Sequence, residues 1–238
     1  MIEVKNLSKA FGVQKVLDKI SFSVNRGEIF VILGESGVGK SVLLKQLNGL
    51  IDPDEGSISI DGVEITSLSE PELLGLRKKI GYLFQEGALY DFMNVYENLS
   101  FPLREHTPLK RKEIVDKVKK VLSLVGLEGV ESKFPSELSG GMKKRVGLAR
   151  AIILDSQILF CDEPTSGLDP IRSRDISNLI QNASRKLSCT TVITSHDITN
   201  ALRIADRIMI IKEGKIAGLG KPSEIKSSPN AFIREFIS

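Results

Sequence analysis

The chain contains 238 residues, of which 41% are apolar and 26% charged, and this composition excludes a disordered or fibrous protein. Its net charge of +3 lacks the basic excess of a nucleic-acid-binding chain, so we expect no nucleic-acid partner. No apolar run reaches the length of a membrane span, no leader is recognised, and Cys161 and Cys189 lie in β-like runs, which predicts a cytoplasmic protein with reduced thiols.

The first distinctive turn is GESGVGKS, residues 34–41, which follows the apolar run EIFVIL and precedes VLLKQLNGLI. This order predicts a buried strand, a tight turn and a helix. The glycines allow backbone N–H groups to turn around a polyphosphate, and the start of the helix adds a favourable potential. Lys40 would reach the β- and γ-phosphates, and Ser41 would ligate Mg²⁺. A chance Gly-Lys-Ser in a glycine-rich turn is the alternative.

Gln85 ends the next predicted strand, KIGYLF. Its amide can contact Mg²⁺ and the attacking water, as water-positioning glutamines do in other nucleotide hydrolases, although a polar residue after a strand is common. From about Leu89 to Leu154 the pattern becomes helical. In EIVDKVKKVLSLVGL the apolar residues recur at helical spacing, and Gly126 provides the stop.

A second glycine-rich helix start lies within this helical block, in ELSGGMKKRVGLARAI. Gly140 and Gly141 follow Ser139 directly. Glycines are used where a backbone must come close to another group, and helix starts attract anions. The stretch therefore predicts a second anion-binding turn.

Acidic residues and a histidine end two later strands. Asp162 and Glu163 follow the apolar run ILFC, at the strand end where ligands collect in open α/β sheets. Asp162 suits the Mg²⁺ shell, and Glu163 would orient or deprotonate the water that attacks the γ-phosphate. His196 follows the run TTVITS and can hydrogen-bond the γ-phosphate or that water. The alternatives are a solvent-facing strand end and a structural histidine.

Strand–helix alternation interrupted by a helical block predicts an α/β fold with an inserted α-helical subdomain. We place one domain over residues 1–238, with its core in 1–88 and 156–238 and the helical subdomain in 89–155. The residues considered so far predict a Mg²⁺-dependent nucleoside triphosphatase, a kinase or a GTP switch.

LSGGM, with GESGVGKS before it and DEPTSGLD and SHD after it, resembles the ABC-type ATPases over essentially the whole chain. The resemblance implies a RecA-like P-loop NTPase core, an N-terminal antiparallel β subdomain and an α-helical subdomain that carries LSGGM. It also implies a head-to-tail homodimer with ATP at the interface, in which the LSGG turn of one subunit closes on the γ-phosphate held by the other. Glu163, His196, Lys40 and Gln85 would be catalytic, and Ser41, Gln85 and Asp162 would hold Mg²⁺.

In this family Phe11 matches the aromatic that stacks on adenine, although a core phenylalanine would look the same, and Asp169 matches a loop that links the two sites. The nucleotide-binding residues implied in this way are Phe11, Gly34, Glu35, Ser36, Gly37, Val38, Gly39, Lys40, Ser41, Val42, Ser139, Gly140, Gly141 and Asp169.

The loop after Gln85, the signature GGMKKRVGLARAI and the C-terminal segment look most like the ATPases of MCE-associated, Mla-type lipid transporters. Met142 departs from the LSGGQ of most importers. The resemblance implies a permease, an MCE-domain protein and a place on the cytoplasmic face of the inner membrane. Leu89, Tyr90, Phe92 and Met93 would contribute to the permease groove, or would simply cover the subdomain's own core. Another cargo (an amino acid, ion, drug or lipoprotein) and a soluble ABC ATPase without a permease are the alternatives.

Overall fold

The computed structural model describes residues 1–238 and contains two compact units, residues 1–77 with 190–238 and residues 78–189. The elements of the first unit are β1 (Ile2–Phe11), β2 (Gln14–Val24), β3 (Ile29–Leu33), α1 (Lys40–Leu47), β4 (Glu55–Ile60), β5 (Val63–Glu64), the 3-10 helix Ile65–Ser67, α2 (Glu70–Arg77), β8 (Thr190–Ser195), α7 (Ile198–Ile204), β9 (Arg207–Lys212), β10 (Lys215–Gly220), α8 (Pro222–Lys226) and α9 (Ala231–Ile237). Those of the second are β6 (Ile80–Leu83), α3 (Val95–His106), α4 (Arg111–Leu124), the 3-10 helix Pro135–Glu137, α5 (Gly140–Ile152), β7 (Ile158–Asp162) and α6 (Pro170–Leu187). The helical subdomain predicted at 89–155 stays a prediction.

The first unit begins with an antiparallel sheet in the order β2-β1-β4-β5, which confirms the predicted N-terminal β subdomain. Near its end, the strand β2 alternates strictly between buried and exposed residues. Ile20, Phe22 and Val24 are buried, whereas Ser21 and Ser23 between them are exposed. This period of two is the signature of a strand with one buried face.

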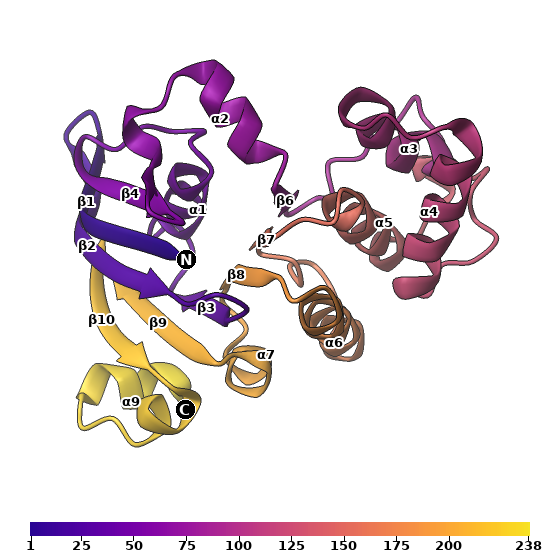
Figure 1. Cartoon of the computed structure of the whole chain (residues 1–238). Helices are drawn as coiled ribbons and strands as arrows, with labels where there is room; N and C mark the ends of the chain where they lie inside the picture. The colour runs from indigo at the N-terminus through magenta and orange to yellow at the C-terminus, as the bar shows by residue number, and fades with distance from the viewer. The chain divides into compact units, whose positions relative to one another are not determined.

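The second sheet of this unit contains the parallel strands β3, β8 and β9, with β3 between the other two, and β10 pairs with β9 in the antiparallel direction (Figure 1). Every residue of β3 and β8 is buried, which explains the unbroken apolar runs in the sequence. Leu33 at the end of β3 pairs with Ser195 at the end of β8. The segments that follow these two strands, residues 34–41 and His196, therefore leave the sheet at the same edge.

In the second unit β6 and β7 are parallel, and α5 lies directly against β6. Gly81 in β6 makes this close approach possible, because a Cβ atom there would lie 2.0 Å from the carbonyl oxygen of Ala151. Side chains are therefore excluded at this position, and the last turn of α5 is fixed relative to the strand that precedes Gln85.

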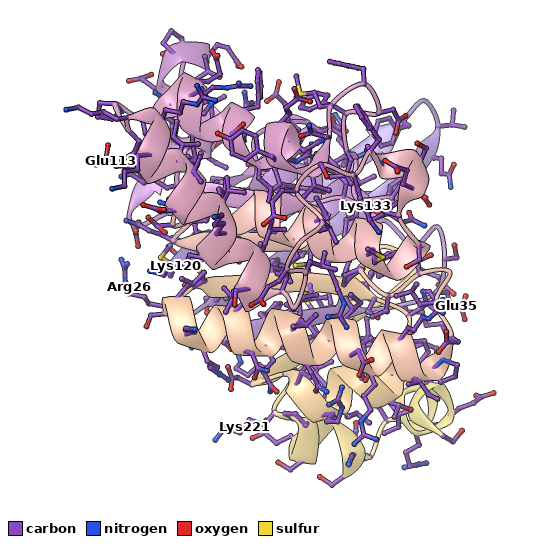
Figure 2. The ribbon with its side chains drawn as sticks, turned by 90° about the vertical axis from the view of Figure 1, so that its right-hand side faces the viewer. Arg26, Glu35, Glu113, Lys120, Lys133 and Lys221 are labelled. Carbon is purple, nitrogen blue, oxygen red and sulfur yellow. The ribbon has the colours of Figure 1, made fainter.

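The helix α4 confirms the predicted periodicity: Ile114, Val118, Val121 and Leu122 are its buried residues. Glu113 and Lys120, labelled in Figure 2, lie on its exposed side. The helical character predicted from Leu89 begins only at Val95, because residues 84–94 form a loop held by side-chain hydrogen bonds. No helix of the structure is both long and apolar enough to span a membrane.

Candidate functional site

The turn at residues 34–41 joins β3 to α1, as the sequence predicts. Gly39 caps α1 with φ +103°, a backbone conformation that favours glycine. A Cβ atom at Gly39 would also lie 2.8 Å from Cγ1 of Val16. Both the conformation and the neighbouring side chain therefore require glycine at the start of this helix.

Lys40 is the first residue of α1 and is only 5% exposed. Its Nζ donates hydrogen bonds to the carbonyl oxygens of Gly34, at 2.8 Å, and Glu35, at 2.9 Å. The turn therefore wraps around an ammonium group at a helix N-terminus, an arrangement whose positive potential suits a phosphate. Ser36 and Gly37, by contrast, are exposed at the tip of the turn.

Phe11 and His196 also belong to the first unit. Phe11 ends β1 and is 50% exposed, so it is not a core residue. The ammonium of Lys9 lies 5.6 Å from the centre of its ring. His196 is exposed at the sheet edge where residues 34–41 begin. Asp197, its neighbour, caps α7 by accepting a hydrogen bond from the backbone N–H of Asn200 at 3.0 Å.

In the second unit Asp162 ends β7 and Glu163 follows it, and both side chains are buried. The Tyr82 hydroxyl lies 3.5 Å from Oδ2 of Asp162. Burial, followed by the nearby Asp162, raises the pKa of Tyr82, which therefore stays a neutral donor. The φ of Glu163 is +44°. Such a backbone is costly for a non-glycine residue, and residues held in this way are enriched at active sites.

Gln85 lies beside the turn that follows Glu163. Its Nε2 donates a hydrogen bond to Oγ of Ser166 at 3.2 Å. The backbone N–H of Ser166 donates in turn to the carbonyl oxygen of Glu163 at 3.1 Å. Gln85 and Glu163, which sequence analysis selected separately, are thus connected through one serine.

Ser139 caps α5, and its Oγ accepts a hydrogen bond from the backbone N–H of Met142 at 3.4 Å. A Cβ atom at Gly140 would meet nothing within 4 Å, and one at Gly141 would meet only Cδ of Arg172, at 4.0 Å. Neither glycine has a positive φ. The protein's own packing therefore does not explain the glycine pair, whereas the close approach of a ligand does.

A cavity of about 370 Å³ adjoins this helix start. The residues that line it are Gly126, Leu127, Ser139, Gly141, Met142, Arg145, Arg172, Asp175 and Ile176. Asp169 lies near it as the cap of α6, since its Oδ1 accepts a hydrogen bond from the backbone N–H of Arg172 at 3.0 Å. In this structure Asp169 therefore has a structural role as a cap, beside the role that the family resemblance implies.

Two further residues, which sequence analysis missed, hold the loop at 84–94. Asn98 is fully buried; its amide accepts a hydrogen bond from the backbone N–H of Tyr90 and donates to the carbonyl of Met93, both at 2.9 Å. Arg150 donates to the carbonyl oxygens of Gly87 and Ala88, at 3.1 and 2.8 Å. The signal available in the sequence was a polar Asn98 on the apolar face of α3.

The loop presents aromatic residues to solvent. Phe92 is 76% exposed and Tyr90 is 40% exposed, and their ring centres lie 5.9 Å apart. The guanidinium of Arg150 lies 5.3 Å from the centre of the Tyr90 ring. Leu89 and Met93 are half-buried. The half-burial of Leu89 and Met93 fits the interpretation that these side chains cover the core of the subdomain, whereas the exposure of Phe92 does not fit it.

Each residue predicted to hold Mg²⁺ has an oxygen atom of the hard kind that this ion prefers, and Mg²⁺ is usually bound by one or two carboxylates together with phosphates. Ser41 offers a hydroxyl and Asp162 a carboxylate. Gln85 donates through Nε2, so its amide oxygen is the accepting end. No group of three or more His, Cys, Asp or Glu side chains forms an all-protein metal site.

Comparisons with known proteins agree with these features. The family model described as "ABC transporter" matches residues 17–166. The probable ribonucleotide transport ATP-binding protein Mkl of Mycobacterium leprae is 45% identical over all of this chain, which spans 68% of Mkl. The intermembrane phospholipid transport ATP-binding protein MlaF of Escherichia coli is 40% identical over all of this chain and 88% of its own.

A solved structure of a dimeric ATP-binding cassette, in a post-hydrolysis state bound to ADP and phosphate, has the same fold. Its TM-score is 0.85 at 30% identity, over 93% of this chain and 99% of that one. The predicted P-loop NTPase fold is thereby confirmed.

Proposed function

Since the chain belongs to the ABC transporter family and is an ATPase, we propose that it works as a dimeric ATP-driven subunit of a membrane transporter that moves phospholipid. The observation that carries the dimeric mechanism is the glycine pair at the start of α5, which no contact within the chain requires. The identity to MlaF over the whole chain supports the phospholipid cargo.

ATP binding rests on the turn at residues 34–41. Lys40 exchanges its hydrogen bonds to the carbonyls of Gly34 and Glu35 for bonds to the β- and γ-phosphates. The exposed ring of Phe11 stacks on adenine. Ser41, Gln85 and Asp162 would hold Mg²⁺, which when bound would neutralise charge on the phosphate oxygens.

Hydrolysis rests on Glu163, Gln85 and His196. Glu163 orients the attacking water and accepts its proton. Gln85 orients the same water, and His196 donates a hydrogen bond to the γ-phosphate as its charge changes. The left-handed backbone of Glu163 and its link to Gln85 through Ser166 support this assignment, because both restrict where the carboxylate can lie.

The second copy of the chain supplies Ser139, Gly140 and Gly141 to the same ATP. Its Ser139 hydroxyl and the exposed start of α5 stabilise the γ-phosphate. ATP thus belongs to the head-to-tail interface, and hydrolysis removes the contact that favours closure. Glu163→Gln should bind ATP and accumulate as an ATP-dependent dimer in size-exclusion chromatography. Normal turnover in this variant would refute the role of Glu163.

At the membrane we propose that the exposed aromatics Tyr90 and Phe92 receive a helix of an integral permease, with an MCE-domain protein in the same assembly. The subunit would then be peripheral on the cytoplasmic face of the inner membrane. Exposed aromatic side chains at one loop are typical of a protein interface.

The cargo is tested by purifying the tagged chain from detergent-solubilised membranes and identifying the proteins and lipids bound to it. Co-purification of a permease and an MCE-domain protein would support phospholipid transport. Co-purification of a substrate receptor for ribonucleotides would overturn it; Mkl is named as a probable ribonucleotide transport ATP-binding protein. Phe92→Ser should lose the permease while keeping the ATPase activity of the isolated subunit, and Lys120→Ser on the exposed side of α4 is the matched control.

A further inference from the structure

Lys144 lies in α5, five residues after Ser139, and is only 8% exposed. A buried ammonium is costly unless it is paired and hydrogen-bonded. Here Nζ of Lys144 donates a hydrogen bond to the backbone carbonyl oxygen of Ser166. Burial lowers the pKa of Lys144, while the nearby carboxylates of Glu86 and Glu163 oppose this shift by favouring its charged form.

Ser166 is the point at which three segments meet. Its carbonyl accepts from Lys144 of α5, and its hydroxyl accepts from Gln85 after β6. Its N–H donates to the carbonyl of Glu163 and closes the turn after β7. One serine therefore connects the signature helix, the Gln85 loop and the backbone of Glu163, the residue assigned to the attacking water. Neither the role of Lys144 nor that of Ser166 follows from the family motifs.

We infer that Lys144 is a positioning residue for hydrolysis: it ties the turn that carries Glu163 to the helix that begins at Ser139. When α5 contacts the nucleotide of the second copy, Lys144 keeps residues 163–166 at a fixed distance from α5. Lys144 contacts the carbonyl oxygen of Ser166, whereas Gln85 contacts its hydroxyl, so the Gln85 amide stays in place at the same time. The inference rests on the proposed role of Glu163 and explains why a lysine is buried here.

The chain provides a matched control. Lys143 is the adjacent residue of the same helix, carries the same charge and is half-exposed. A variant at Lys143 changes the net charge and the helix propensity as one at Lys144 does, but leaves the Ser166 contact intact. Lys144→Met removes the ammonium while keeping much of the side-chain length, and Lys144→Arg restores a cation that can reach the carbonyl.

The experiment measures kcat and KM for ATP in the purified wild-type chain and in these three variants. We expect kcat of Lys144→Met to fall about tenfold or more, because small displacements of catalytic groups cost rates of this order. KM should stay within about twofold, since no contact of the phosphate-binding turn is removed. Lys144→Arg should recover most of the rate, and Lys143→Met should match the wild type.

A second measurement separates positioning from binding. The double variant Lys144→Met with Glu163→Gln should still dimerise in the presence of ATP, because nucleotide binding and closure do not need Lys144. Failure of the double variant to dimerise, where Glu163→Gln alone does so, would overturn the inference, as would wild-type kcat in Lys144→Met. An equal rate loss in Lys144→Arg and Lys144→Met would overturn it too. Normal hydrolysis by Glu163→Gln alone would instead refute the proposed function.

Discussion

Arg150 is expected to stabilise the loop at residues 84–94 by an amount that a single substitution can measure. In Arg150→Met the aliphatic stem is kept while the guanidinium is lost. Its hydrogen bond to the buried Gly87 carbonyl is charge-assisted and is worth about 1.5–3 kcal/mol. Water can replace the bond to Ala88, whose residue is exposed. The contact with the Tyr90 ring adds about 1 kcal/mol.

Together these losses predict about 3 kcal/mol of destabilisation, which for a chain of this size lowers Tm by about 6–12 °C. Thermal unfolding followed by circular dichroism measures the shift. Hydrogen–deuterium exchange of the loop should accelerate, because the Tyr90 N–H is protected by its hydrogen bond to Asn98 in a loop that Arg150 also holds. Lys120→Met, on the exposed side of α4, is the control. A fall in Tm no larger than that of the control, with unchanged exchange, would refute the reasoning.

Four other predictions follow from the structure. Lys40→Ala should weaken ATP binding at least tenfold in isothermal titration calorimetry, and unchanged affinity would exclude the assigned role. Ser139→Arg should abolish turnover while the monomer still binds ATP; unimpaired hydrolysis would refute the trans site. Gly140→Ala should lower kcat without lowering Tm, whereas Gly147→Ala, whose Cβ would lie 3.1 Å from Cα of Gly87, should lower Tm. Burial raises the pKa of Cys189 to about 11, so Ellman's reagent should not label it at pH 8 until guanidinium unfolds the chain.

Much of the fold follows from local patterns. The turn at residues 34–41 was predictable because its glycines and the adjacent apolar run lie within one short segment. The helix α4 was predictable because four buried residues recur with the period of a helix. In both cases the information lies within about fifteen consecutive residues, which is the range over which periodicity acts.

The loop at 84–94 could not be predicted in this way. Its conformation depends on Arg150, which contacts the Gly87 carbonyl 63 residues earlier in the chain, and on Asn98 from the next helix. The contact between Lys144 and Ser166 likewise joins residues 22 apart. Long-range hydrogen bonds to backbone carbonyls leave no residue pattern, because every residue offers the same acceptor.

Two glycines of α5, Gly140 and Gly147, occupy their positions for different physical reasons, and the difference indicates which of them serves function. Gly147 is favoured by the packing of the fold, since a Cβ atom there would lie 3.0 Å from Cδ1 of Leu83 and 3.1 Å from Cα of Gly87, closer than most Cβ contacts. Gly140 faces open space and has an ordinary backbone, so alanine would cost the fold nothing and would even favour the helix. The stability of the fold therefore gives no reason for a glycine at this position. Because this residue lies at an exposed helix start beside a serine hydroxyl, the reason that fits is an anionic group supplied from outside the chain.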